Sequence, residues 1–377
     1  MTENDPSDTR DVLVVGGGPA GATAAALCAG KGLSVGLIDC RERPRESPDR
    51  VWLNAEARKL FEPCGADPDA LFGQPLQAVT FHTSDFAKSM RSSLAPSAVH
   101  VIDRAVLENA LLEAAASAGT SIWAGQSVTA LEVLEEHVRL DLADDSQLEA
   151  RYLIGADGAA SGIARQLGLV TPTDPGWWRA QWDADLTQKS KPKPAQAELD
   201  MAIVLGLIEA RGFGYVLHQP DHYLIGVAGP GTADEIGEHF ELFVSDAEEA
   251  DLVPRGVQPT QPVVVPSPAG AAVEMETHVG KRSLLVGSAG GFVSAISDEG
   301  IYPGMWSAAI AVDVLVDALG SETGQDVLAE YDTRWRVAMA DYLRMPNTDL
   351  HFLLPLIFSN QQMADRMAAA FFCGQNI

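Results

Sequence analysis

The chain has 377 residues, which suits one large domain or two fused domains better than a minimal one. Hydrophobic residues make up 46% and charged residues 21% of it, so a packed core is expected. Lys and Arg number 26 against 52 Asp and Glu, and the net charge of −26 argues against nucleic acid or an anionic membrane as a main partner. The four cysteines, at positions 28, 40, 64 and 373, show no metal-binding spacing, so neither a metal site nor a disulfide scaffold is expected.

The start of the chain is polar and acidic. The range 1–10 predicts a disordered leader and has no apolar segment of the kind that a signal peptide requires. The longest apolar stretch, at 305–319, is interrupted by Asp313 and Asp317, so no transmembrane segment is expected. These features predict a cytoplasmic protein.

The range 11–39 has the pattern that opens a doubly wound α/β fold. An apolar run at 11–15 is followed by a glycine-rich turn, an alanine-rich helix to Ala29 and a second apolar run at 34–39. Farther on, helices are predicted at 54–64 and 103–118, and strands at 121–123, 127–134, 137–142 and 151–156.

The range 174–268 differs in character from the rest. Its prolines cluster at 191–194 and 262–268, and alternating hydropathy at 215–217 and 222–228 indicates sheet. We predict an α/β protein: a Rossmann-like domain at 11–173 and 269–325 with an inserted β-sheet substrate domain at 174–268. The range 75–100 is expected to add strands to the inserted sheet. A strand at 281–287 and a long helix at 301–319 are expected where the first domain resumes, and residues 326–377 form a C-terminal helical segment.

Gly16, Gly18 and Gly21 form a Gly-x-Gly-x-x-Gly motif between the first predicted strand and its helix. The first glycine permits a tight turn, the second lets a pyrophosphate approach the backbone, and the third lets the helix pack on the strand. The helix start offers free N–H groups to the phosphates. Asp39 ends the next strand, where its carboxylate can accept the ribose hydroxyls of an adenosine. The sequence therefore predicts a dinucleotide-binding site.

Two further motifs decide which dinucleotide. The range 152–158 reads Tyr-Leu-Ile-Gly-Ala-Asp-Gly, and 287–292 reads Gly-Ser-Ala-Gly-Gly-Phe, followed by Asp-Glu-Gly-Ile at 298–301. From about residue 11 to about residue 335, the sequence resembles the FAD-dependent family that joins aromatic hydroxylases of the p-hydroxybenzoate hydroxylase type, geranylgeranyl reductases and flavin halogenases. The resemblance implies a fold in which the Rossmann-like domain binds FAD.

The resemblance also implies where FAD lies. The pyrophosphate would meet the glycine-rich helix start, the adenosine would lie near Asp39 and Val128, and the flavin would lie near Arg104 and the turn before the long helix. The residues implied to bind FAD are Gly16, Gly18, Pro19, Ala20, Gly21, Asp39, Cys40, Arg41, Arg104, Val128, Asp157, Gly158, Ser288, Gly300 and Ile301.

Ser288 departs from the family pattern, which has an Asp after the glycine. A charged hydrogen bond contributes about 1.5–3 kcal/mol and a neutral one about 0.5–1.5 kcal/mol. The exchange of Asp for Ser therefore removes about 1 kcal/mol, up to about tenfold in affinity. We predict that FAD binds but is lost more easily on purification.

The branch of the family is indicated by what the sequence lacks. The resemblance to geranylgeranyl reductases implies a Cys-Gly pair, but Asp49 and Arg50 occupy its place. The Trp-x-Trp-x-Ile-Pro motif of the halogenases is not found at 177–182, and Lys59, the nearest lysine, fits an exposed helical position better than a catalytic one.

We therefore predict an FAD-dependent monooxygenase that uses a flavin C4a-hydroperoxide to oxygenate a bulky apolar or aromatic substrate. The substrate is a small molecule or a protein side chain modified during cofactor maturation. NAD(P)H visiting the flavin, or a partner reductase, would supply electrons. Two alternatives stay open: a flavin reductase of alkenes, and a non-catalytic flavin-binding or partner-binding protein. No single catalytic residue is assigned, and the candidates for the substrate pocket are Trp52, Trp178, Trp182, Tyr215, His218 and Tyr302, of which Tyr302 is preferred.

Three other features carry weaker expectations. The arginines at 41, 43, 45 and 50 either meet a ribose or a nicotinamide phosphate or form a solvated loop. Asp332, Arg334 and Arg336 are expected on a solvated helix face. The range 352–358 is either a lipid- or partner-facing patch or, as we prefer, a helix closing the substrate domain.

Overall fold

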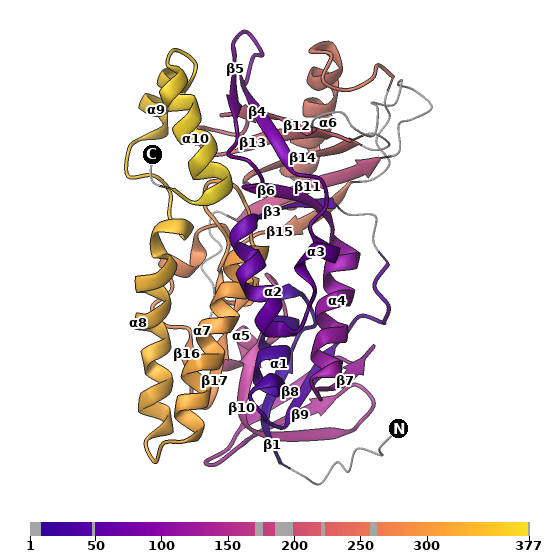
Figure 1. Cartoon of the computed structure of the whole chain (residues 1–377), viewed down its shortest axis with the longest axis vertical. Coiled ribbons are helices and arrows are strands. Elements are labelled where there is room, and N and C mark those ends of the chain that lie inside the picture. Colours follow the sequence, from indigo (N-terminus) through magenta and orange to yellow (C-terminus); the bar gives the residue numbers. More distant parts are fainter. Residues whose placement is uncertain are drawn as a thin grey trace.

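The computed structural model describes residues 9–46, 50–169, 176–184, 199–219, 223–256 and 262–375. Most of the predicted leader, Asp49 and the proline cluster at 191–194 lie outside these ranges. Two sheets follow each other along the long axis of the molecule, and helices from the C-terminal part of the chain run beside both (Figure 1).

The first sheet has eight strands in the order β16-β17-β10-β1-β2-β7, with β9 paired to β10 and β8 to β9. The pairs β17–β10, β10–β1, β1–β2 and β2–β7 are parallel. The predicted strand–turn–helix–strand unit at 11–39 is present, because β1, α1 and β2 follow one another there. The strands are β1 (Arg10–Val15), β2 (Val35–Asp39), β7 (Ser121–Ala124), β8 (Val128–Val133), β9 (Val138–Leu142), β10 (Gln147–Gly155), β16 (Val279–Gly280) and β17 (Ser283–Leu285).

Both faces of this sheet are covered, which explains why its central strands are apolar throughout. Val12 and Val14 of β1 face a core formed with helices, whereas Leu13 and Val15 face β8, β9 and α5. The helices of this half are α1 (Pro19–Gly30), α2 (Arg58–Cys64), α3 (Pro68–Leu71), α4 (Arg104–Ser117), α5 (Gly162–Leu167), α7 (Ile301–Leu319) and α8 (Gly324–Leu343). Short 3-10 turns are η1 (Ala55–Ala57), η2 (Ala271–Val273) and η3 (Gly287–Gly290).

The helix α7 bears on the expectation that no segment crosses a membrane. By length and composition its 19 residues are sufficient to cross a membrane, although the sequence reading found no such stretch. Within the structure, 61% of its most apolar window is buried, and it packs against α1 and α8. Such burial is typical of the core helix of a folded domain.

The second sheet has seven strands in the order β15-β11-β14-β13-β12-β4-β5. β4 and β5 lie within the range 75–100, between β2 and β7 of the first sheet in sequence, whereas β11 to β15 lie between β10 and β16. The strands are β4 (Leu76–Thr83), β5 (Ser89–Ser93), β11 (Trp177–Ala184), β12 (Leu199–Leu205), β13 (Phe213–His218), β14 (Tyr223–Pro230) and β15 (Val263–Pro266), and a separate pair is formed by β3 (Arg50–Asn54) and β6 (Val99–Asp103).

One face of the second sheet is covered by α6 (Ala233–Glu249), a helix that the sequence reading missed. Its sequence carries a capping box, in which Thr232 and Glu235 bond to each other's backbone N–H groups, and Ile236, Phe240 and Phe243 at helical spacing. The acidic residues at 246–249 lie at its C-terminal end.

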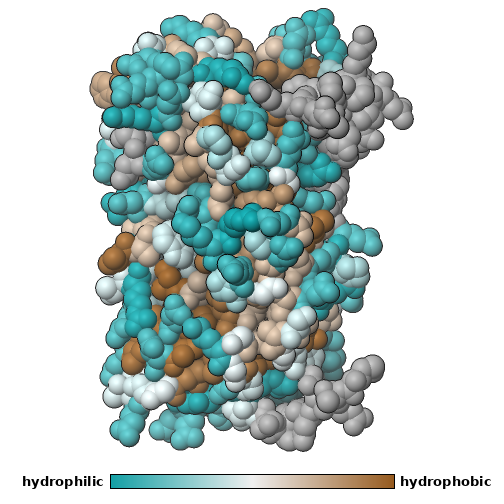
Figure 2. Space-filling model, viewed as in Figure 1, coloured by the Kyte–Doolittle hydropathy of each residue, from teal (hydrophilic) through white to brown (hydrophobic). Residues whose placement is uncertain are grey.

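The other face of the second sheet packs against α10 (Gln361–Cys373) and α9 (Leu350–Ile357). In α9, Ile357 is buried against this sheet and Leu353 is buried as well, whereas Phe352 is 73% exposed. The range 352–358 therefore covers the sheet with one side and leaves apolar surface on the other. Figure 2 shows mainly hydrophilic side chains on the viewed face, with apolar ones more visible in its lower half, where helices pack.

Candidate functional site

A cavity of about 550 Å³ opens where the parallel strands of the first sheet end and extends to the second sheet. At one end it is lined by the loop after β1 and the end of β2, and at the other by Arg179 of β11, Ser267 and the turn before α7. Of the fifteen residues implied to bind FAD, all except Gly21 line it. The structure thus brings motifs from residues 16 to 301 to one elongated site.

The three motif glycines differ in what a side chain at each position would meet. A Cβ at Gly16, where φ is +107°, would overlap the carbonyl of Ala156, and one at Gly21 would overlap the carbonyl of Gly16. A Cβ at Gly18 would meet nothing closer than Arg41 Nη2 at 4.0 Å. Packing within the chain therefore requires the first and third glycines but not Gly18, which leaves the backbone open to a ligand.

Gly18 is also the N-cap of α1, and no side chain caps this helix. Gly17, Gly18, Pro19 and Ala20 all line the cavity, so the free N–H groups and the positive end of the helix dipole face it. This arrangement fits a pyrophosphate, whose oxygens would take the place of the missing cap.

Asp39 is 4% exposed at the end of β2, and it is bound by arginine. Its Oδ2 contacts Arg45 Nη2, and its Oδ1 accepts a hydrogen bond from the Arg41 backbone N–H at 2.9 Å. Arg45 is buried, so the arginine run is not a solvated loop at this position. The carboxylate is held in place beside the cavity and still fits an adenosine ribose.

A buried glutamate on α4 organises the same arginines. Glu108 is 2% exposed and contacts Arg104 Nε at 3.0 Å, Arg41 Nη1 at 3.0 Å and Arg45 Nε at 3.5 Å. The sequence reading missed Glu108 and the buried role of Arg45. The available signal was the position of Glu108, next to Leu107 on the apolar face of a predicted helix. A buried carboxylate requires a basic partner that is buried with it.

The Asp157–Gly158 pair lies beside the same cavity, but the carboxylate serves the fold. Asp157 Oδ2 accepts from the backbone N–H groups of Gly162 at 2.8 Å and Ile163 at 3.0 Å, and Ser161 donates to its Oδ1. Asp157 thereby holds the start of α5. Sequence reasoning missed Gln126, Ser127 and Gln166, three polar neighbours of Val128 that also line the cavity.

The far end of the cavity is closed by the residues before α7. Ser288, Val293, Asp298, Gly300 and Ile301 line it. Asp298 is 3% exposed; its Oδ2 lies 3.3 Å from Arg179 Nη1, and Ser267 donates to its Oδ1. Burial raises the pKa of Asp298, and Arg179 and Ser267 oppose that rise. The sequence reading did not identify Asp298, Arg179 or Ser267 as site residues.

The candidates for a substrate pocket do not line the cavity. Trp178 and Trp182 lie in the core between the second sheet and α6, and His218 stacks on Tyr223 of the same core at 4.2 Å. These three are therefore on the wrong face of the sheet, because side chains alternate along β11 and β13.

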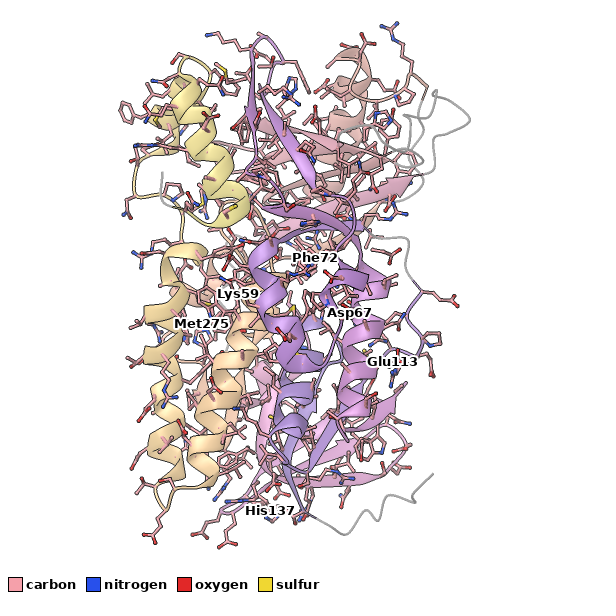
Figure 3. The ribbon with its side chains drawn as sticks, viewed as in Figure 1. Lys59, Asp67, Phe72, Glu113, His137 and Met275 are labelled. Carbon is pink, nitrogen blue, oxygen red and sulfur yellow. The ribbon has the colours of Figure 1, made fainter. Side chains whose placement is uncertain are left out.

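The other candidates are packed closer to the cavity. Trp52 and Tyr215 meet edge to face with ring centroids 5.1 Å apart, on the side of the sheet that faces the first domain. Tyr302 is 9% exposed and stacks on Trp306 at 5.5 Å. The lysine considered above, Lys59, is 74% exposed and pairs with Glu56 on the surface of the helical layer (Figure 3).

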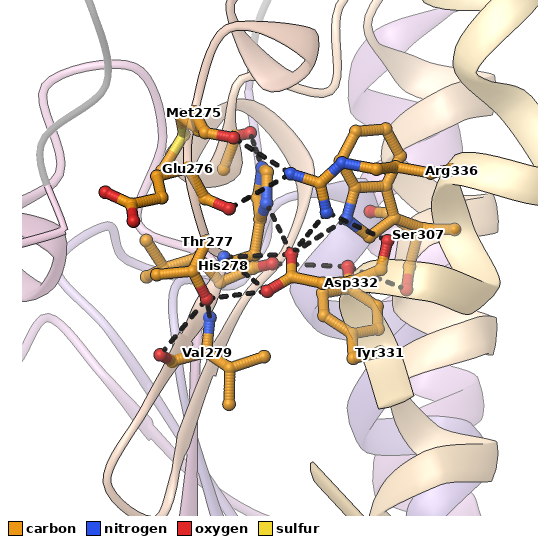
Figure 4. A network of polar contacts seen from close by, with 12 residues as sticks. Met275, Glu276, Thr277, His278, Val279, Ser307, Tyr331, Asp332 and Arg336 are labelled. Carbon is orange, nitrogen blue, oxygen red and sulfur yellow. Dashed lines mark hydrogen bonds and ion pairs between the residues drawn. The ribbon is translucent and has the colours of Figure 1, made fainter. Parts of the chain in front are cut away.

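A second layer of contacts supports the turn η3 at the cavity wall (Figure 4). His278 is fully buried; its Nε2 lies 2.8 Å from the carbonyl of Gly290 and its Nδ1 3.1 Å from Asp332 Oδ1. Asp332 also accepts from Thr277 and Arg336. Burial raises the pKa of Asp332, but the hydrogen bonds from His278 and Thr277 outweigh that rise and hold the pKa well below the usual range. Asp332 thus belongs to a support for the cavity wall, and the expectation that it lies on a solvated face was wrong.

The cavity therefore offers open backbone N–H groups, an aspartate for a ribose and a long channel to the second sheet, which together fit FAD. Among the residues that the structure describes, no group of three or more His, Cys, Asp or Glu is placed to hold a metal ion. The FAD binding domain model matches residues 9–339. The chain belongs to this FAD-binding family. It is an FAD-dependent enzyme of the oxidoreductase class.

Relatives within the family carry different activities. The chain is 29% identical over 350 residues to digeranylgeranylglycerophospholipid reductase 1 of Methanococcoides burtonii, covering 87% of this chain and 80% of the relative. It is 30% identical over 167 residues to rifampicin monooxygenase of Streptomyces venezuelae, covering 44% of this chain and 35% of the relative.

Solved structures share the fold. A geranylgeranyl bacteriochlorophyll reductase-like protein from Thermoplasma acidophilum superposes with a TM-score of 0.72 at 18% identity, covering 96% of each chain. PqsL of Pseudomonas aeruginosa, described as a probable FAD-dependent monooxygenase, gives 0.67 at 19% identity, covering 97% of this chain and all (100%) of the other. Reductases and monooxygenases thus share this architecture, and the fold alone does not separate them.

Proposed function

We propose that this protein is an FAD-dependent monooxygenase that oxygenates a bulky aromatic substrate carrying polar groups. The observation that supports this choice is the row of polar side chains on β11. Arg179, Gln181 and Asp183 alternate with Ala180 and Trp182, which pack toward α6, so the polar row is on the side of Arg179, which lines the cavity.

The neighbours of this row are polar and aromatic. Tyr215 donates to Gln181 Oε1 at 2.7 Å, and the backbone N–H of Arg50 donates to Asp183 Oδ2 at 3.1 Å. Trp52 lies against Tyr215. An aromatic substrate with hydroxyl, carboxyl or amide groups can exchange hydrogen bonds with such a polar row, whereas a prenyl chain has no group that does so.

Bound FAD supplies the activation of molecular oxygen, and the residues of this chain bind it, orient the substrate and exclude water. One oxygen atom enters the substrate and the other leaves as water. This balance takes up two protons and two electrons, the electrons from NAD(P)H or from a partner reductase. A cytoplasmic location suits both donors.

A second function is favoured by the curated relatives that match most of the chain, which are reductases of digeranylgeranylglycerophospholipid. In that reaction, two electrons and two protons would saturate an alkene and no oxygen would be consumed.

One experiment separates the two functions. The FAD-loaded protein is given isotopically labelled oxygen gas, an NAD(P)H-driven reductase system and a panel of phenols, aromatic acids and Trp- or Tyr-containing peptides. In parallel it is given the unsaturated lipid anaerobically with dithionite. Labelled oxygen in an aromatic product supports the proposal, and anaerobic saturation of the lipid without any oxygenated product overturns it.

Variants connect the result to the wall. Gln181→Leu removes one neutral hydrogen bond, so we expect kcat/KM to fall about two- to tenfold. Trp178→Phe, on the opposite face of the same strand, is the matched control and should leave kcat/KM near the wild-type value. Equal effects of both variants would count against a substrate at the polar row.

A further inference from the structure

Glu299, the residue before the N-cap of α7, has both carboxylate oxygens engaged and is 5% exposed. Its Oε1 accepts from the backbone N–H groups of Ile301 at 2.9 Å and Tyr302 at 2.8 Å. Its Oε2 accepts from the Tyr342 hydroxyl of α8 at 2.9 Å. The carboxyl group thus occupies amide donors in the first turn of a long core helix.

The position of Glu299 relative to the cavity follows from its neighbours. Asp298 and Gly300, on either side of it, both line the far end. The pyrophosphate fits the open backbone at Gly18 and the adenosine fits Asp39, so the remaining half of FAD, which carries the ring, extends to this far end. Glu299 therefore lies one residue away from the wall beside the ring.

The charge of this group matters for the reduced cofactor. Reduction of the bound ring by two electrons and one proton adds one negative charge. Free N–H groups at a helix start favour negative charge, and a carboxylate disfavours it. In this protein the carboxyl group both occupies the first-turn N–H groups and, when ionised, places a like charge close to the ring.

We propose that Glu299 is a positioning residue that sets the reduction potential of the bound FAD through its own charge, lowering the potential when ionised. The inference depends on FAD binding and holds for either reaction under the proposed function, because the potential belongs to the cofactor site and not to the substrate.

The surroundings of the Glu299 carboxyl group make it titrate near neutral pH. Burial raises the pKa of Glu299 to about 7, the neighbouring Asp298 adds to the rise, and bonds from Tyr302, Tyr342 and Ile301 oppose it. Tyr302 and Tyr342 are themselves neutral over this range, because burial raises their pKa values further. Arg179, the cation that reaches this loop from β11, pairs with Asp298.

The test is the reduction potential of FAD in the intact, FAD-loaded protein, measured by spectroelectrochemistry without substrate. Glu299→Gln keeps an acceptor for the two amides and removes the charge. At roughly pH 8.5 we expect reduced FAD to gain about tenfold in affinity relative to oxidised FAD, a rise of about 30 mV for a two-electron couple. At roughly pH 5.5, below the pKa of Glu299, the two potentials should agree. Glu113→Gln, exposed on α4, is the matched control (Figure 3).

A second variant guards against a folding defect in Glu299→Gln. Tyr342→Phe removes a donor that stabilises the ionised carboxylate, so the pKa of Glu299 should rise in this variant. The change in reduction potential with pH should therefore occur at a higher pH in Tyr342→Phe than in wild type. Equal potentials for wild type and Glu299→Gln at high pH would overturn the proposal. An offset that is the same at every pH would also overturn it, because a structural effect has no reason to follow the titration of this carboxyl group.

Discussion

The buried carboxyl group of Glu299 makes the stability of the protein depend on pH, and Glu299→Gln should remove that dependence. A group whose folded-state pKa is raised binds its proton more tightly in the folded protein than in the unfolded chain. Its contribution to the free energy of unfolding is therefore fully present below the unfolded pKa and is lost as the pH rises through the folded pKa.

The magnitude follows from the two pKa values. Burial raises the pKa of Glu299 from 4.5 to about 7, a difference of about 2.5. At 1.36 kcal/mol for each pKa unit, the wild-type protein should lose about 3 kcal/mol of stability from this group between roughly pH 4 and pH 8. The Gln variant carries no such term, so its stability relative to wild type should rise by about 3 kcal/mol over the same interval.

The assay is unfolding by urea at several pH values, for wild type, Glu299→Gln and the exposed control Glu113→Gln. Two concentrations of free FAD are used so that stabilisation by ligand binding can be subtracted. All other groups titrate equally in wild type and variants. The quantity of interest is therefore the difference between wild type and variant in how the free energy of unfolding changes with pH. A wild-type minus Gln difference that stays constant from acid to neutral pH would refute a protonated Glu299 in the folded state.

Three further substitutions test the cofactor site. Ser288→Asp restores a charged acceptor at the cavity wall and should tighten FAD binding up to about tenfold, measured by flavin fluorescence titration. Gly18→Ala should weaken FAD binding more than about tenfold while changing stability by less than about 1 kcal/mol, because its Cβ enters space that only the ligand uses; a matching loss of stability would show that packing needs this glycine. Arg45→Ala should lower the free energy of unfolding by about 3–5 kcal/mol in urea, because it leaves Asp39 and Glu108 without their buried partner. Arg43→Ala, on the exposed part of the loop, is the control and should have little effect.

The cofactor half of the fold was predictable because local chemistry dictates it. A glycine with φ of +107° and a helix that packs on a backbone carbonyl leave few residues permitted at Gly16 and Gly21. The long apolar run at 301–319 likewise predicted α7 over its observed range, Ile301–Leu319. The helix α6 was not predicted. Its capping box lies in a range whose prolines and alternating hydropathy indicated sheet throughout.

The substrate side was less predictable for a geometric reason. In a strand, adjacent side chains point to opposite faces, so a shift of one residue exchanges pocket and core. Trp178 and Trp182 are as aromatic as Trp52, yet the alternation of β11 directs them to α6 and directs Arg179 and Gln181 to the cavity side. The aromatic character of a residue therefore identified candidates, and only the register of the sheet decided which face each one occupies.

Asp298 and Glu299 show the same limit at the level of charge. The two acids are adjacent in sequence and both are buried, but a guanidinium from the second sheet meets Asp298, whereas a neutral tyrosine hydroxyl meets Glu299. Ionised Asp298 forms a pair with Arg179 that carries no net charge, so its field at the ring is small. Within the described part of the chain, no cation forms such a pair with ionised Glu299. Protonation of Glu299 is therefore the change that alters the electrostatic environment of the flavin.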